Sequence, residues 1–234
     1  MSDSAGRRGR QGPLLRAVNG LLRLALGMVV LLVALILLYG FVPVPSTLML
    51  GRWLTLQPVE RQWVKLSDIS PHLVRAVIAS EDQRYCSHRG VDWVELDAVM
   101  DDEDGPSRGA STLTMQTAKN VFLWPGRSYL RKGLEIPLAL VLDFAWGKQR
   151  VMEVYLNVAE WGDGLYGAEA ASERYFGKPA SRLSPAEAAR LAAALPNPLL
   201  RDLGKPGGSL RAAAGRVQRR LGQIGTLADC ALPR

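Results

Sequence analysis

The most pronounced pattern along the chain is an uncharged apolar run from Leu24 to Val42, LALGMVVLLVALILLYGFV. As a helix, about 19 residues span roughly 28 Å, which matches the hydrocarbon core of a bilayer. The run is longer than the apolar part of a usual signal peptide, and no small-x-small cleavage site follows it. We therefore predict a transmembrane helix over residues 24–42, with a cleaved signal peptide as the alternative.

After this run, the spacing of apolar residues predicts helices almost throughout. Residues 43–69 contain Pro43, Pro45 and Pro58 and are interpreted as an irregular linker. Strand signals are weak in residues 70–234, so this outer domain should be mainly α. Helices are predicted from Ser70-Pro71 to Glu81, over 111–122, over 131–157 with kinks at Pro137 and Gly147, from a capping box at Ser184 to Pro196, and over 211–224.

Charge indicates how the anchor is oriented. Five arginines and one acid, Asp3, precede the apolar run: Arg7, Arg8, Arg10, Arg16 and Arg23. Because positive residues stay in the cytoplasm, residues 1–23 should form a cytoplasmic tail and residues 70–234 a periplasmic domain of an inner-membrane protein. The net charge of +7 suits a nucleic acid, an anionic membrane or a phosphorylated substrate. This topology argues against a nucleic acid, and without ATP outside the cell a synthetic enzyme needs a pre-activated substrate.

Cysteine and histidine are scarce, with two residues of each. These numbers exclude a disulfide framework and a His-rich metal site. Cys86 and Cys230 stand in unrelated segments, so we expect two free thiols.

Glu81 and Asp82 stand at the predicted C-terminal end of the helix that begins at Pro71, within the segment EDQRYCSHRGVD. Two carboxylates oppose the helix dipole there, and a broken local rule without visible compensation often marks function. The dipole, together with burial, would raise a carboxyl pKa toward that of a general base. The plainer interpretation is an exposed acidic helix end.

Two later segments carry polar side chains at helical spacing. In GASTLTMQTAKN, residues 109–120, Ser111 fits a helix cap, and Gln116, Lys119 and Asn120 share one face, which is either solvated or the wall of a cleft. In RSYLRKGLE, residues 127–135, a basic cluster is closed by an acid: Arg127, Arg131, Lys132 and Glu135. Such a cluster suits a pyrophosphate, although a solvated face with an Arg131–Glu135 pair is the alternative.

Taken in order, these blocks resemble the motifs of the peptidoglycan glycosyltransferase family, and most closely its monofunctional biosynthetic branch. The matching blocks, which cover about residues 70–200, are EDQRYCSHRGVD, GASTLTMQTAKN, RKGLE, KQRVMEVYLN and SPAEAARLAAALPNP. The resemblance implies a lysozyme-like α-helical fold with a larger lobe and a smaller, membrane-proximal lobe. It further implies that the enzyme links lipid II, a disaccharide-peptide on undecaprenyl pyrophosphate, to the growing glycan strand.

By this resemblance Glu81 is the general base and Glu135 a second essential acid. Lys119 and Arg127 would hold the donor pyrophosphate, and other cleft positions would be Ser111, Gln116, Asn120, Arg131 and Lys132. The family often uses a divalent cation such as Mg²⁺ or Mn²⁺ near the pyrophosphate, but the sequence shows no dedicated ligand set, so no metal ligand is assigned. Expected partners are the membrane, lipid II, the glycan strand and other cell-wall synthesis or division proteins, and no nucleic acid.

The chain departs from the family pattern at a few positions. Tyr85 replaces a usual Phe, Ala110 replaces a frequent Gly, and Cys86 occupies a variable position. Met115 replaces the first of two Gln, which would weaken binding if that Gln contacts substrate. All the charged positions are present, so we expect an active enzyme.

Two other functions fit parts of the pattern. Paired acids on a helical fold also suit a lysozyme-like hydrolase of the same polymer. The cations Lys119, Arg127 and Arg131 argue against it, because a neutral sugar leaving group needs none. An inactive, membrane-anchored scaffold is the second alternative, and the presence of both Glu81 and Glu135 argues against it.

Overall fold

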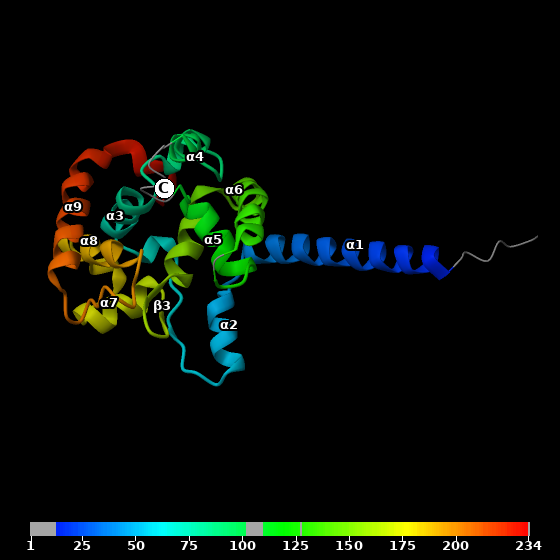
Figure 1. Cartoon of the computed structure of the whole chain (residues 1–234). Coiled ribbons are helices and arrows are strands. Elements are labelled where there is room, and N and C mark those ends of the chain that lie inside the picture. Colours follow the sequence, from blue (N-terminus) through cyan, green and yellow to red (C-terminus); the bar gives the residue numbers. More distant parts are fainter. Residues whose placement is uncertain (1–12, 102–109, 127, 234) are drawn as a thin grey trace, which may run out of the picture. The chain divides into compact units, whose positions relative to one another are not determined.

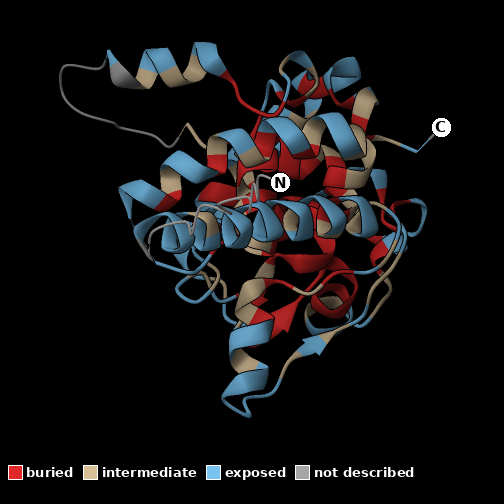
Figure 2. Ribbon diagram, turned by 90° about the vertical axis from the view of Figure 1, so that its right-hand side faces the viewer, coloured by how far each residue is buried: buried red, intermediate tan, exposed pale blue. Residues whose placement is uncertain are grey.

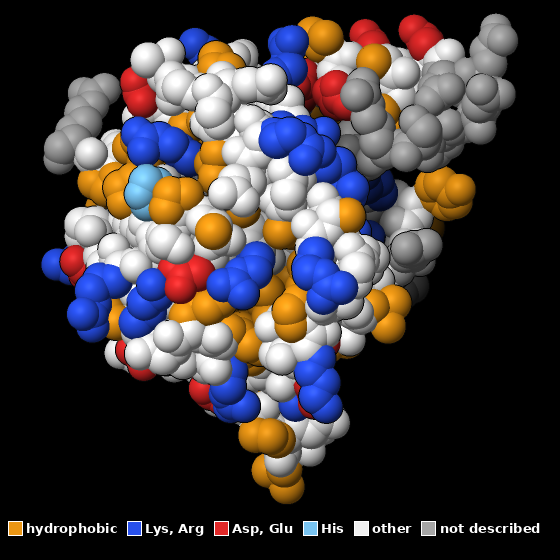
Figure 3. Space-filling model, turned by 90° about the vertical axis from the view of Figure 1, so that its left-hand side faces the viewer, with side chains coloured by type: hydrophobic (Ala, Val, Ile, Leu, Met, Phe, Trp, Pro, Cys, Tyr) orange, Lys and Arg blue, Asp and Glu red, His pale blue; other side chains and the backbone are white. Residues whose placement is uncertain are grey.

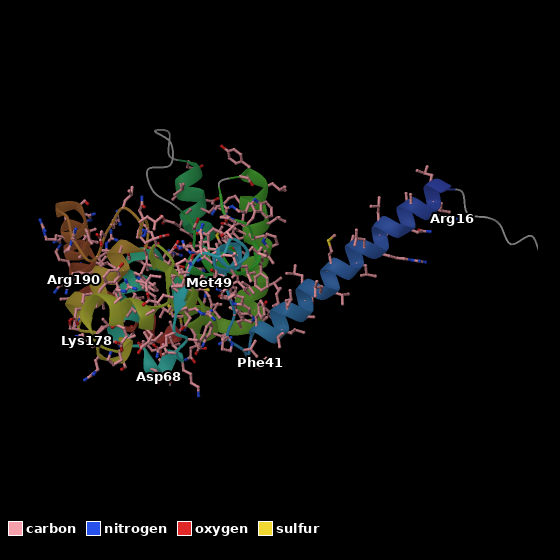
Figure 4. The ribbon with its side chains drawn as sticks, turned by 90° about the horizontal axis from the view of Figure 1, so that it is seen from below. Arg16, Phe41, Met49, Asp68, Lys178 and Arg190 are labelled. Atoms are coloured by element: carbon pink, nitrogen blue, oxygen red, sulfur yellow. A yellow bond between two sulfur atoms is a disulfide. The ribbon has the colours of Figure 1, made fainter. Side chains whose placement is uncertain are left out.

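The computed structural model describes residues 13–101, 110–126 and 128–233, and the chain divides into two compact units, Met1–Phe41 and Val42–Arg234 (Figure 1). The described part of the first unit is essentially one helix, α1 (Pro13–Tyr39), with Arg16 near its start and Phe41 just beyond its end (Figure 4). Its segment Leu14–Tyr39 has a mean hydropathy of 2.9 over its most apolar stretch, of which 6% is buried. This helix is long and apolar enough to be a single-pass membrane anchor.

The second unit is mainly helical, as predicted. Its α-helices are α2 (Thr47–Leu54), α3 (Pro71–Glu81), α4 (Trp93–Met100), α5 (Leu113–Phe122), α6 (Tyr129–Val158), α7 (Ala168–Phe176), α8 (Pro185–Ala194) and α9 (Gly208–Ile224). Short 3-10 turns are η1 (Leu66–Asp68), η2 (Tyr85–Ser87), η3 (Ala180–Arg182) and η4 (Gly225–Ala231).

A small sheet of very short strands lies beside α7. Its order is β1 (Glu60–Arg61), β3 (Leu165–Tyr166) and β2 (Glu160–Gly162). The pair β1–β3 is parallel, with Glu60 opposite Leu165, and the pair β2–β3 is antiparallel. Strands of two or three residues are too short to show an alternating pattern, which explains the weak strand signal in the sequence.

The helix α2 corrects the prediction of irregular chain between Pro43 and Ile69. The three prolines lie outside its eight residues, so they delimit the helix and do not break it. Ser46 caps its start, accepting a hydrogen bond from the Met49 amide at 3.2 Å. Met49 is fully buried and lies among the side chains of the interior (Figure 4).

Several predicted helix ends are confirmed. Ser70 caps α3 with Pro71 in the first turn, and Ser184 and Glu187 form the capping box of α8. The long helix α6 is interrupted at Gly147, whose φ of 67° and ψ of 172° favour glycine. The predicted kink at Pro137 does not appear as a break, because non-helical dihedrals inside α6 occur at Gly147 alone.

The main core lies between α3, the second half of α6, α7, α8 and α9 (Figure 2). Trp161 is its largest fully buried side chain, and its indole N–H donates to the Leu191 carbonyl at 3.1 Å. Much of the α8 surface in this core consists of alanine: Ala188, Ala189, Ala192, Ala193 and Ala194. Small side chains on α8 let α3 and α9 pack closely against it.

The prediction of free thiols is wrong. Cys86 of η2 and Cys230 of η4 form a disulfide, with their Cα atoms 5.7 Å apart. They are separated by 144 residues, and packing of η4 against η2 and α3 brings them together. The Gln149 amide of α6 also donates to the Leu232 carbonyl at 2.5 Å, which joins the segment after η4 to α6.

Candidate active site

Glu81 is the last residue of α3, as predicted, and its carboxylate lies between α5 and α8. Oε2 accepts a hydrogen bond from the Gln116 side-chain amide at 3.2 Å. Oε1 lies 3.0 Å from the Ser80 hydroxyl, which is also 3.4 Å from the Ala192 carbonyl of α8. Two polar neighbours therefore hold the carboxylate in one place.

The electrostatic setting of Glu81 suits a general base. Burial raises the pKa of its carboxyl above the ordinary value, while hydrogen bonds from Gln116 and Ser80 and the charge of Arg201 act in the opposite direction. Asp82 raises the pKa slightly further. Burial is thus the main cause, and a carboxylate with a raised pKa accepts a proton more readily.

Asp82 has a different environment from its neighbour. Its carboxylate is buried, lies 3.0 Å from His88 Nε2, and accepts a hydrogen bond from the Leu113 amide at 2.9 Å. Leu113 is the first residue of α5, so an anion here also complements the dipole of that helix. Asp82 therefore joins the end of α3 to the start of α5, and Glu81 is the acid available for chemistry.

On α5, Gln116 and Lys119 lie toward Glu81. The Tyr155 hydroxyl of α6 donates to Gln116 Oε1 at 3.2 Å, which fixes the amide so that its N–H₂ group faces Glu81. Burial and the charge of Arg131 lower the pKa of Lys119, whereas Glu81 raises it. Asn120 meets α2 through its backbone carbonyl, which accepts a hydrogen bond from Thr47 at 3.3 Å.

The first turns of α6 bring the basic cluster to the same region. Arg131 and Glu135 are 8% and 3% exposed and form an ion pair. The Lys132 ammonium lies 3.0 Å from Glu135 Oε2 and 2.5 Å from the Ser111 hydroxyl. Burial, then the charges of Arg131 and Lys119, lower the pKa of Lys132, as expected for cations held close together.

Ser111 does not cap α5, because Thr112 has that position and accepts from the Met115 amide at 3.1 Å. The Ser111 hydroxyl is therefore free to contact Lys132. Arg127 lies outside the described residues.

A cavity of about 510 Å³ lies beside Glu81. Its lining runs from Ser111 and Gln116 on α5 and the segment before it to Pro196 and Arg220 near α8 and α9. The sequence did not point to Arg220 or to the supporting hydroxyl of Tyr155, because each stands in a helical pattern that suggests no chemistry.

Two of the departures from the family pattern lie in the core, whereas Ala110 lines the cavity beside Glu81. Met115 is fully buried beside Val91 and Ala139, so a side chain at that position faces the core and not the cleft. Tyr85 is also fully buried and donates to the Lys148 carbonyl at 2.8 Å.

A dedicated metal site is not evident in the part of the chain that the structure describes. There, His, Cys, Asp and Glu form no group of three or more that could hold a metal ion. The described residues thus do not fit a cation bound by the protein alone, and no step is assigned to one.

Comparisons with known proteins agree with this geometry. Residues 49–223 match the family described as Transglycosylase. A biosynthetic peptidoglycan transglycosylase of Agrobacterium fabrum strain C58 is 53% identical over 212 residues, which cover 86% of this chain and 94% of the relative. Proteins of the same name from Rhizobium meliloti and Brucella suis are 50% and 52% identical, covering 88% and 85% of this chain and 89% and 92% of their own.

These matches confirm the resemblance and the lysozyme-like helical fold. They also argue against a hydrolase, since these relatives are named biosynthetic peptidoglycan transglycosylases. Because the family match covers most of the chain and the relatives align along nearly their whole length, this chain belongs to the peptidoglycan transglycosylase family.

Proposed function

We propose that this enzyme polymerises lipid II outside the cytoplasmic membrane, with Glu81 as the general base. The observation that carries the proposal is a half-buried carboxylate of raised pKa, hydrogen-bonded to Gln116, in a cavity near Lys119 and Lys132. A base close to a group of cations suits a hydroxyl nucleophile and a pyrophosphate leaving group.

In the proposed reaction, Glu81 removes the proton from the 4-hydroxyl of lipid II. The oxygen attacks the anomeric carbon of the growing strand, forms a β-1,4 bond with inversion, and breaks the bond to undecaprenyl pyrophosphate. The leaving group carries away the bonding electrons as negative charge, which Lys119, Arg127, Arg131 and Lys132 stabilise. Glu135 keeps Arg131 and Lys132 in place through its two ion pairs.

The surface of the second unit supports a location at a lipid surface. Large apolar side chains are exposed on α2 and on the first half of α6, including Leu54, Leu130 and Phe144 at 86%, 70% and 93%. Exposed apolar surface of this kind marks a membrane or protein contact. With the arginine-rich N-terminus inside, the catalytic unit would lie in the periplasm. A reporter that is active only in the periplasm, fused after residue 234, should work, whereas activity of a cytoplasmic reporter alone would contradict this topology.

The test of the reaction is polymerisation of labelled lipid II by the purified full-length protein. Charge-assisted contacts to phosphate contribute roughly 1.5–3 kcal/mol each, so Lys119→Ala or Arg127→Ala should slow polymerisation at least about tenfold. Gln at either position should restore little, and Arg127→Lys should restore part, as a point charge without the planar fork. Lys205→Ala, on an exposed loop, is the matched control.

A hydrolase would give the opposite pattern. The proposal fails if wild type makes no polymer from lipid II while wild type and the cation variants digest purified wall polymer equally well. A scaffold without activity would do neither.

A further inference from the structure

The helix α9 carries four arginines and no acid: Arg211, Arg216, Arg219 and Arg220. All four are exposed, and none of them forms an ion pair with a residue that the structure describes. On the face of the molecule that includes α9, Lys and Arg side chains outnumber Asp and Glu (Figure 3). Arg220 is the arginine of α9 that lines the cavity beside Glu81.

Arg220 is held where two helices end. One of its N–H groups donates to the Ala79 carbonyl in the last turn of α3, at 3.4 Å. Arg201 donates in the same way to the Ala193 carbonyl of α8, at 2.6 Å. The contact between Ser80 and the Ala192 carbonyl joins these two helix ends next to Glu81. Because a guanidinium has five N–H donors, each arginine keeps most of them for another partner.

Arg201 is a charge that acts on Glu81, and Arg220 lines the cavity beside it; neither belongs to α5 or α6, which carry the predicted pyrophosphate cluster. Gln116, Lys119 and Lys132 belong to α5 and α6, and Gln116 contacts Oε2 of Glu81. Ser80, on the α8 side, contacts Oε1.

The acids that line the same cavity are largely engaged elsewhere. Asp92 pairs with Arg84 at 2.9 Å, and Asp82 binds His88 and the Leu113 amide. Glu95, the remaining acid besides Glu81, also has a partner. Arg220 therefore offers positive charge to a ligand in the cavity.

The position of α9 limits which anionic group of a ligand in the cavity can reach Arg220. The largest groups of exposed apolar side chains in this unit lie on α2 and on α6 before Gly147, with smaller groups on α4 and at Leu199 and Leu200. The helix α9 lies on the opposite side of the unit from α2 and α6 (Figure 1). A pyrophosphate joined to a membrane lipid must stay near the apolar side. The part of lipid II that extends away from the membrane is the disaccharide and its peptide, and a peptide ends in a carboxylate.

We propose that Arg220 binds a carboxylate of the peptide carried by the incoming lipid II. This inference rests on the proposed function and assigns a specificity residue to its acceptor. A planar guanidinium matches a carboxylate in bidentate geometry, so the contact favours acceptors with an unmodified acidic peptide. It places the acceptor sugar with its hydroxyl near Glu81.

The experiment compares two forms of lipid II, one with free peptide carboxylates and one with these converted to carboxamides. Full-length wild type, Arg220→Gln, Arg220→Lys and the control Arg216→Gln, one turn earlier on α9, are assayed for polymerisation. Arg220→Gln should raise KM for the carboxylate form about three- to tenfold with little change in kcat, as for a partly exposed charged contact. Arg220→Lys should restore part of the loss, and Arg216→Gln should behave like wild type.

For wild type, KM should be higher for the carboxamide form than for the carboxylate form. Arg220→Gln should not raise KM for the carboxamide form any further. An equal rise in KM for both forms would mean that Arg220 meets the pyrophosphate, and no rise for either would leave it outside the substrate site. Each of these results overturns the proposal, as does an equal effect of Arg216→Gln. If wild type forms no polymer, that result refutes the proposed function but does not test the role of Arg220. The affinity of each variant for the two forms of lipid II, measured in detergent by thermophoresis, then makes the same comparison.

Discussion

Replacing Glu135 by Gln tests whether this acid is the counter-ion that the structure shows. The carboxylate and the Arg131 guanidinium are both buried, at 3% and 8% exposure, and form an ion pair. Glu135→Gln keeps the shape of the side chain but leaves Arg131 buried beside a neutral group. Removing one partner of a buried pair typically costs about 3–5 kcal/mol of folding free energy.

The contact between Lys132 and Glu135 adds little to this free-energy cost. Its ammonium lies 3.0 Å from Glu135, but its side chain is 40% exposed, so solvent screens the interaction. Such a pair contributes less than about 1 kcal/mol. In a domain of this size about 1 kcal/mol moves Tm by roughly 2–4 °C, so Glu135→Gln should lower Tm by about 6–20 °C.

The assay is thermal unfolding of the full-length protein in detergent, followed by circular dichroism. The double variant Arg131→Met with Glu135→Met is the matched comparison, and it should lose far less stability because neither charge remains buried. If Glu135→Gln melts within about 2 °C of wild type, the ion pair does not stabilise the fold. Loss of polymerisation in such a stable variant would then place Glu135 in the chemistry itself.

Three other predictions concern Glu81 and its support, and a fourth concerns the disulfide. Glu81→Gln should reduce polymerisation about 10²–10⁴-fold with Tm unchanged, and activity within a few-fold of wild type would remove Glu81 from the role of base. Since burial raises the pKa of Glu81, the wild-type rate should fall with decreasing pH at a value above that of an ordinary glutamate; a rate profile that falls only at the ordinary value would contradict this. Tyr155→Phe frees Gln116, so kcat should fall about fivefold, the equivalent of one hydrogen bond, whereas unchanged kcat would show that Gln116 needs no support. A thiol count on denatured, unreduced protein should find no free thiol, and Cys86→Ala with Cys230→Ala should cost about 2–4 kcal/mol of stability; two free thiols would refute the disulfide.

Several helix ends could be predicted from local signals. The N-caps at Ser70 and Ser184 were recognisable because capping depends on a few adjacent residues. The helix α2 was missed because three nearby prolines suggested irregular chain, although all of them lie outside its bounds. The break at Gly147 was predictable, whereas α6 continues through the exposed Pro137 without non-helical dihedrals there.

The site was predictable to the extent that it follows motifs. The position of Glu81 at a helix end agrees with the sequence. The Arg131–Glu135 pair was predicted only as part of a solvated helix face, whereas both side chains are buried. The engagement of Asp82 with Leu113, the support from Tyr155 and the approach of Arg220 arise from contacts between distant segments. The Cys86–Cys230 pair escaped prediction for the same reason, since sequence spacing carries no record of how η4 packs.

The alanines behind Glu81 have a consequence for the mobility of the site. Ala76 and Ala79 of α3 and Ala192 and Ala193 of α8 are buried where the two helices pack together. Alanine has no side-chain rotamers, so ordering this support costs no side-chain entropy on folding and permits no rotamer exchange afterwards. The backbone that carries Glu81 thus packs against a helix surface with few alternative conformations. The carboxylate therefore meets each successive acceptor from a nearly unchanged position.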